Sequence, residues 1–202
     1  MTKRITISTL DAMKASGDKF VMITAYDATF ARLASEAGAE TILVGDSLGM
    51  VLQGHETTIP VSLDAMAYHT ECVARARPHS LIIADLPFMS FSNSDDTLHA
   101  STRLMQAGAQ MVKLEGGTWL SDSIHRLVER GVPVCAHLGL TPQSVNVFGG
   151  YRVQGRTPKE AKSILADAVE IQDAGASLLV LECIPAELAA DISSKLDIPV
   201  IG

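Results

Sequence analysis

Short apolar runs alternate with helical patterns along almost the whole chain, and this alternation constrains the fold more than any other feature. The runs contain β-branched residues and end at Gly, Pro or a charged residue, which predicts strands at 20–25, 41–45, 80–84, 110–114, 132–136, 177–181 and 198–201. Helices are predicted between them, near 27–37, 62–76, 94–107, 119–130, 158–173 and 186–195. Strict alternation of strands and helices indicates a parallel α/β fold.

Four similar phrases mark the predicted helix ends: SEAGAE, MQAGAQ, VERGVP and QDAGAS. Each places a glycine where a helix should end, directly before the next strand. A phosphate-binding loop would carry its glycines after a strand and before a helix, so these glycines do not predict such a loop.

Composition and charge limit the kind of protein. The 202 residues are 47% apolar but only 4% aromatic, which predicts one domain over 1–202 with an aliphatic core. The net charge of −7 argues against nucleic acid as a partner. The first 20 residues lack the apolar core of a signal peptide, and no run is long enough to span a bilayer, so we expect a cytoplasmic protein without membrane contact. Cys72, Cys135 and Cys183 suggest neither a disulfide framework nor a zinc site, and Cys135 and Cys183 are expected to be small buried thiols.

Ionisable side chains stand at the ends of most of the predicted strands: Asp46, Asp85, Lys113, Glu115, His137 and Glu182. An unpaired buried charge is expensive, so several charged strand ends predict one shared site where those ends converge. Parallel barrels place their chemistry there, whereas an open sheet draws its ligands from fewer strands. A barrel is therefore favoured, although the chain stops at IPVIG with one strand fewer than eight.

The residue types at these strand ends suggest a metal and proton transfer. Asp46 and Asp85 offer the oxygen ligands that Mg²⁺ prefers, but each alone could be a turn or helix-capping aspartate. Lys113 and Glu115 share one face of a strand. Lys113 could hold an anionic group of a substrate while Glu115 supports the metal, or the two residues could form a purely structural pair. His137 could be hydrogen-bonded structure, while Glu182 follows the apolar run LLVL and could serve as a general base.

Other polar residues have simpler interpretations. His55 and Glu56 are expected in a loop, and the remaining histidines, His69, His79, His99 and His125, on helix surfaces or ends. The glycine-rich segment around Arg152 and Arg156 could bind an anion, but a flexible surface loop is the commoner meaning of such a segment.

Longer blocks of the sequence resemble the ketopantoate hydroxymethyltransferase (3-methyl-2-oxobutanoate hydroxymethyltransferase) family. The blocks occur in order from about residue 5 to the end: ITAYDATFA, ILVGDSLGMVLQGHETTIPV, AYHT, ADLPFMSF, MVKLEGG, VPVCAHLGLTPQSVNVFGGYRVQGR and LLVLECIP. The resemblance implies a (β/α)8 TIM-type barrel of the phosphoenolpyruvate/pyruvate superfamily. The last βα unit of that barrel is absent from the chain as written, so the expected domain is C-terminally incomplete.

The resemblance also implies an activity and roles for residues. A hydroxymethyl group would pass from 5,10-methylenetetrahydrofolate to 3-methyl-2-oxobutanoate through a Mg-stabilised enolate, forming 2-dehydropantoate for pantothenate and coenzyme A biosynthesis. Asp46, Asp85 and Glu115 would bind Mg²⁺, and Glu182 would be the proton acceptor. The keto acid would contact Asp46, Ser47, Asp85, Lys113 and His137. Family members form homodecamers of two pentamer rings. The alternatives are a Mg-dependent carbon–carbon lyase or mutase of the same superfamily, or a non-catalytic fragment.

Overall fold

The computed structural model describes residues 4–202, so residues 1–3 of the predicted domain lie outside the described part. The strands are β1 (Met22–Thr24), β2 (Thr41–Val44), β3 (Leu81–Asp85), β4 (Met111–Glu115), β5 (Val134–Gly139), β6 (Leu178–Glu182) and β7 (Val200–Ile201). The helices that the sequence predicted are α2 (Ala28–Glu36), α4 (Leu63–Arg75), α5 (Ser94–Gln106), α6 (Ser121–Glu129), α8 (Pro158–Asp173) and α9 (Ala186–Lys195). All predicted strands and helices are confirmed, with small shifts of their ends.

The sequence did not predict several short helical segments. These are α1 (Ile7–Ser16), α3 (Leu48–Val51), η1 (Thr118–Leu120), η2 (Pro142–Ser144) and α7 (Val145–Phe148). Apart from α1, each has only one turn, which is too short for an apolar period to appear in the sequence. In the described residues, no helix is long and apolar enough to cross a bilayer.

The chain divides into two compact units, one ending at Lys113 and the other running from Leu114 to Gly202. In the first unit, β1, β2, β3 and β4 are parallel neighbours in chain order, and Asp85 of β3 lies opposite Lys113 of β4. In the second unit, β5, β6 and β7 are parallel neighbours, and Gly139 lies opposite Glu182. The prediction of a single domain stays a prediction.

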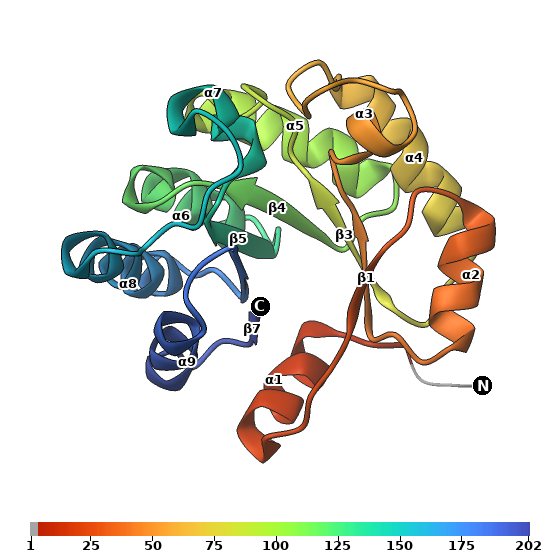
Figure 1. The fold of residues 1–202 in the computed structure, drawn as a ribbon. Coiled ribbons are helices and arrows are strands. Elements are labelled where there is room, and N and C mark those ends of the chain that lie inside the picture. Colours follow the sequence, from red (N-terminus) through yellow and green to blue (C-terminus); the bar gives the residue numbers. More distant parts are fainter. Residues whose placement is uncertain (1–3) are drawn as a thin grey trace. The chain divides into compact units, whose positions relative to one another are not determined.

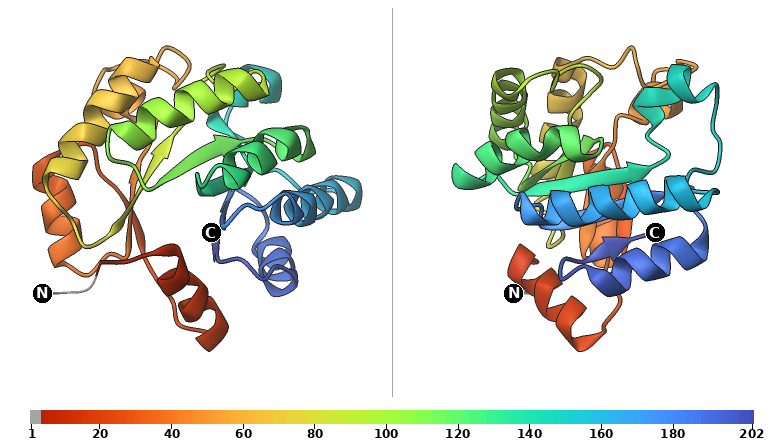
Figure 2. Two further views of the ribbon diagram at one scale, coloured as in Figure 1. Left: turned by 180° about the vertical axis from the view of Figure 1, so that it is seen from behind. Right: turned by 90° about the vertical axis from the view of Figure 1, so that its left-hand side faces the viewer.

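Helices cover the strands within each unit. In the first unit α4 lies beside β2 and β3 and contacts α2 and α5 (Figure 1). In the second unit α8 packs against α9 and β5 (Figure 2). Every residue of β3 and β4 is buried, including their charged ends. The core is aliphatic, as the composition predicted, and is built largely from Ala, Val, Ile and Leu.

The glycines at the predicted helix ends all adopt positive φ, which confirms their role. The values are +96° for Gly38, +112° for Gly108, +78° for Gly131 and +108° for Gly175. Residues with a Cβ rarely adopt this conformation, so the glycine at each of these four positions lets the chain turn sharply from helix to strand.

Replacing two of these glycines should separate backbone strain from packing. Gly38→Ala and Gly108→Ala should each lower the free energy of unfolding by about 1–2 kcal/mol, because alanine is strained at positive φ. Gly108→Ala should lose more, since its Cβ would lie 2.5 Å from the Cβ of Ala74 on α4, whereas nothing lies within 4 Å at Gly38. Urea denaturation measures both losses, and equal losses would contradict the close approach of α4 to Gly108.

Candidate active site

The charged residues singled out in the sequence lie at carboxyl ends of parallel strands, as predicted. Asp85, Glu115 and Glu182 are the last residues of their strands. Lys113 and His137 lie near the ends of β4 and β5, and Asp46 follows β2. All are buried, at 2–5% exposure, except Glu182. The side chain of Glu182 is 44% exposed, so its carboxylate is accessible from solvent.

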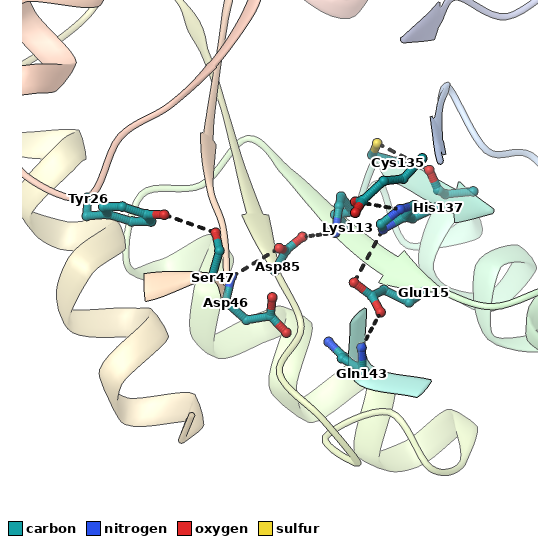
Figure 3. A network of polar contacts seen from close by, with 11 residues as sticks. Tyr26, Asp46, Ser47, Asp85, Lys113, Glu115, Cys135, His137 and Gln143 are labelled. Carbon is teal, nitrogen blue, oxygen red and sulfur yellow. Dashed lines mark hydrogen bonds and ion pairs between the residues drawn. The ribbon is translucent and has the colours of Figure 1, made fainter. Parts of the chain in front are cut away.

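The first unit contains a cluster centred on Asp85, which we call the Asp85 cluster: Asp46, Ser47, Asp85 and Lys113 (Figure 3). Lys113 Nζ lies 2.5 Å from Asp85 Oδ1. The other oxygen, Asp85 Oδ2, accepts a hydrogen bond from the backbone N–H of Asp46 at 3.1 Å. Asp85 therefore links the ends of β2, β3 and β4, and the two aspartates and one lysine carry a formal charge of −1.

The turn after β2 places Ser47 in this cluster. A Cβ on Gly45 would lie 2.8 Å from Ser47 Oγ and 3.4 Å from Asp85 Oδ2, so glycine leaves the space in which the hydroxyl lies. Ser47 Oγ is 3.0 Å from the hydroxyl of Tyr26, which follows β1 (Figure 3). The sequence did not single out Tyr26, although its place after a strand follows the same rule as the charged residues.

The second unit contains a cluster of two carboxylates around a histidine, which we call the His137 cluster: Glu115, His137 and Glu182. His137 Nδ1 lies 3.3 Å from Glu115 Oε1, and His137 Nε2 lies 3.4 Å from Glu182 Oε2. The backbone N–H of Gln143 donates to Glu115 Oε2 at 3.1 Å. Both ring nitrogens of the buried His137 therefore lie within ion-pair distance of a carboxylate.

The backbone around Glu182 is held by the connection that follows β5. Gly139 has a φ of +90°, and a Cβ there would collide with the carbonyl oxygen of Glu182. That same oxygen accepts the N–H of Leu140 at 2.8 Å, and the carbonyl of Cys183 accepts the N–H of Gln154 at 2.9 Å. The end of β6 therefore packs closely against the backbone at Gly139, and only a residue without a Cβ allows this contact.

The cysteines are free, but they do not share one environment. Cys135 is buried as expected, Cys72 is half-buried and Cys183 is exposed. The expectation of a buried thiol is therefore wrong for Cys183. Its φ of +52° places the residue in a sharp turn after β6, which the apolar sequence around it does not reveal.

The residues of the Asp85 cluster fit Mg²⁺. Within residues 4–202, no three or more His, Cys, Asp or Glu side chains form a ready-made metal cage. Mg²⁺ does not require one, because it usually keeps several waters and binds one or two carboxylates. Asp46 and Asp85 supply two buried carboxylates, and a carboxylate has about four acceptor positions, so Asp85 can ligate a cation beside its existing contacts.

The other polar candidates lie outside these clusters. His55 and Glu56 are exposed, as are Arg152 and Arg156. The second unit has a cleft of about 320 Å³ beside α8, and Trp119, Glu160 and Asp167 contribute to its lining. No arginine or lysine of the described chain is among its lining residues, so the cleft offers no cation to an anion.

Solved structures establish the fold class. The chain is similar to 2,3-dimethylmalate lyase, a member of the PEP mutase/isocitrate lyase superfamily, with a TM-score of 0.69, 18% identity, and coverage of 96% of this chain and 70% of the other. It is also similar to phosphonopyruvate hydrolase, with a TM-score of 0.68, 16% identity, and coverage of 97% and 80%. Residues 4–202 have the α/β barrel fold of these structures, with seven strands in this part of the chain, which confirms the predicted class.

Sequence comparison then establishes the family. Residues 4–202 match the family described as ketopantoate hydroxymethyltransferase. The chain is 55% identical over 202 residues to 3-methyl-2-oxobutanoate hydroxymethyltransferase of Saccharophagus degradans, covering all of this chain and 75% of that protein. It is 57% identical over 198 residues to the Pseudomonas putida enzyme of the same name, covering 98% and 74%. The chain belongs to the ketopantoate hydroxymethyltransferase family.

The buried ion pair of the Asp85 cluster should dominate the local energetics. Lys113→Met should lower the free energy of unfolding by about 3–5 kcal/mol, because it removes the cation beside a buried carboxylate. The double variant Lys113→Met/Asp85→Asn should lose less, since the remaining amide is neutral. Urea denaturation of the variants measures both losses.

The exposed pair of Lys195 and Asp191 provides the matched control for this experiment. Its atoms lie 3.0 Å apart, but both side chains are 48% exposed. Lys195→Met should therefore cost no more than about 1 kcal/mol. A Lys113→Met loss no larger than the Lys195→Met loss would contradict the importance of the buried pair.

Proposed function

We propose that this chain transfers a hydroxymethyl group from 5,10-methylenetetrahydrofolate to 3-methyl-2-oxobutanoate. With one water, the products are 2-dehydropantoate, which leads to pantothenate, and tetrahydrofolate. The observation that carries this proposal is the identity of 55–57% to enzymes named for this reaction, over at least 98% of the chain. The same match favours the transferase over a lyase or mutase, because the lyase relatives share only the fold.

The Asp85 cluster supplies groups that suit an anionic keto acid. An ammonium group has three donors, so Lys113 can hold Asp85 and an oxygen of the substrate at the same time. The hydroxyl of Ser47 can donate to another oxygen of the same molecule. We assign substrate contacts to Asp46, Ser47, Asp85, Lys113 and His137.

Magnesium would be held by Asp46, Asp85 and Glu115. Glu115 lies two residues after Lys113 on β4, and the two-residue repeat of a strand directs both side chains to one face. When bound, Mg²⁺ would act as a Lewis acid that stabilises negative charge on the 2-oxo oxygen. The two buried aspartates exceed the charge of Lys113 by one, which supports a role for a cation here.

Glu182 is our proposed base. Its carboxylate would take the C3 proton of the keto acid, and the electron pair of that bond would move toward the 2-oxo oxygen. The resulting enolate carbon would then form the bond to the one-carbon unit. Both C–N bonds of that unit to the folate would break, and the water would supply the hydroxyl oxygen of the product. The exposure of Glu182 leaves its carboxylate accessible to substrate. The contact of His137 Nε2 with one oxygen of this carboxylate can orient the Glu182 side chain. Lys113 would stabilise the same developing anion.

Two broader properties belong to this proposal. Large apolar side chains are exposed, including Phe30, Val51, Met89, Trp119 and Val147. We also propose a homo-oligomer, on the ground of the family resemblance, which implies a decamer of two pentamers. The free cysteines support a reducing, cytoplasmic location.

Glu182→Gln should leave keto acid binding nearly intact and abolish exchange of the C3 proton with solvent deuterium, because an amide cannot accept that proton. Proton NMR of 3-methyl-2-oxobutanoate in D₂O measures the exchange, and calorimetry measures the binding. Glu187→Gln on α9, also an exposed glutamate, is the control and should exchange at the wild-type rate. Wild-type exchange in Glu182→Gln would refute the assignment of the base.

Asp46→Asn and Asp85→Asn should each weaken divalent metal binding by at least about tenfold, because each removes a charged oxygen ligand while keeping the side-chain volume. Electron paramagnetic resonance of Mn²⁺ measures free metal during a titration, independently of activity. Asp191→Asn, on the surface of α9, should titrate like wild type. An unchanged titration of either cluster variant would remove that residue from the ligand set.

A further inference from the structure

Tyr26 is held at two points within the first unit. Its hydroxyl lies 3.0 Å from Ser47 Oγ, and its carbonyl oxygen lies 2.8 Å from Nδ1 of His69 on α4. The rings of Tyr26 and His69 also meet edge to face, at 6.5 Å between centroids. The phenol is therefore held beside Ser47, and His69, which lies on α4 as expected, also contacts Tyr26.

The direction of these hydrogen bonds follows from the groups involved. A carbonyl oxygen only accepts, so Nδ1 of His69 carries the proton and donates to Tyr26. Between Tyr26 and Ser47 either hydroxyl could donate. A phenol is a stronger acid than an aliphatic alcohol, so donation from Tyr26 to Ser47 is the stronger arrangement.

We propose that Tyr26 is a positioning residue that directs the proton of Ser47 toward the keto acid. A hydroxyl has one proton, and if Ser47 accepts from Tyr26, its own proton is available for another acceptor. The carboxylate and 2-oxo oxygens of a keto acid are acceptors only. Because Gly45 has no side chain, there is room for Ser47 Oγ beside Asp85. The hydroxyl of Ser47 therefore lies within the Asp85 cluster, where we propose that the keto acid binds.

This inference rests on the proposed function, because it concerns the substrate contact of Ser47. Tyr26→Phe removes the phenolic donor but keeps the ring against His69. It should raise KM for 3-methyl-2-oxobutanoate about five- to tenfold, the effect of one lost hydrogen bond, and change kcat by less than about twofold. The Kd of the keto acid, measured by calorimetry, should rise by the same factor.

Tyr68→Phe is the matched control. The ring of Tyr68 also meets that of His69 edge to face, with centroids 5.3 Å apart, and Tyr68 is 60% exposed. Tyr68→Phe removes a hydroxyl from a ring that contacts His69, but it leaves the contact between Tyr26 and Ser47 in place. It should leave both KM and kcat within about twofold of wild type.

A double-mutant cycle with Ser47→Ala decides whether Tyr26 acts through Ser47. Ser47→Ala should raise KM, and adding Tyr26→Phe should raise it no further. A wild-type KM in Tyr26→Phe, or an equal rise in both backgrounds, would overturn the inference while leaving the proposed function intact. A wild-type KM in Ser47→Ala, or no folate-dependent turnover by the wild-type protein, would instead overturn the proposed site or function.

His69→Ala provides a second test that does not alter the phenol. It removes the donor to the Tyr26 carbonyl, so the tyrosine loses one of its two anchors. The KM for 3-methyl-2-oxobutanoate should rise by a smaller factor than in Tyr26→Phe. This rise should occur in the wild-type background but not in the Ser47→Ala background. An unchanged KM would overturn the role of His69 in positioning Tyr26.

Discussion

The buried ion pair between Lys113 and Asp85 is the interaction on which the first unit's site depends. Both side chains are 4% exposed, so neither charge is solvated, and each offsets the cost of burying the other. The pairing requires β3 and β4 to lie parallel with these residues opposite each other, as the register shows. Through Asp85 Oδ2 it also holds the backbone after β2. Asp85 thus connects three strand ends through one ion pair and one backbone hydrogen bond.

In the second unit a histidine, rather than a lysine, lies beside the buried carboxylate. Glu115 is buried at 5% exposure, and its oxygens meet His137 and the backbone N–H of Gln143. The second ring nitrogen of His137 faces the accessible Glu182, our proposed base, so the histidine can orient that carboxylate.

Local signals made most of the fold predictable. The strands and the glycines after the helices follow from apolar runs and from the need for positive φ, which depend on neighbouring residues alone. Asp46, Asp85, Lys113, Glu115 and His137 could be found because a charge at the end of a buried strand is unusual. Tyr26 was missed because a tyrosine there is unremarkable, and the Gln143 contact because a backbone donor has no sequence signature. The exposure of Glu182 and Cys183 depends on the connection after β5, whose course local patterns do not predict.

We propose that carboxylates at strand ends hold a divalent cation that binds a 2-oxo acid. Anomalous diffraction from crystals grown with Mn²⁺ and 3-methyl-2-oxobutanoate tests this proposal most directly, because manganese is located independently of any assumed ligand. We expect one manganese peak coordinated by oxygens of Asp46 and Asp85, with oxygens of the keto acid in the same coordination shell. A manganese ion away from both aspartates, or a keto acid bound elsewhere on the chain, would contradict it.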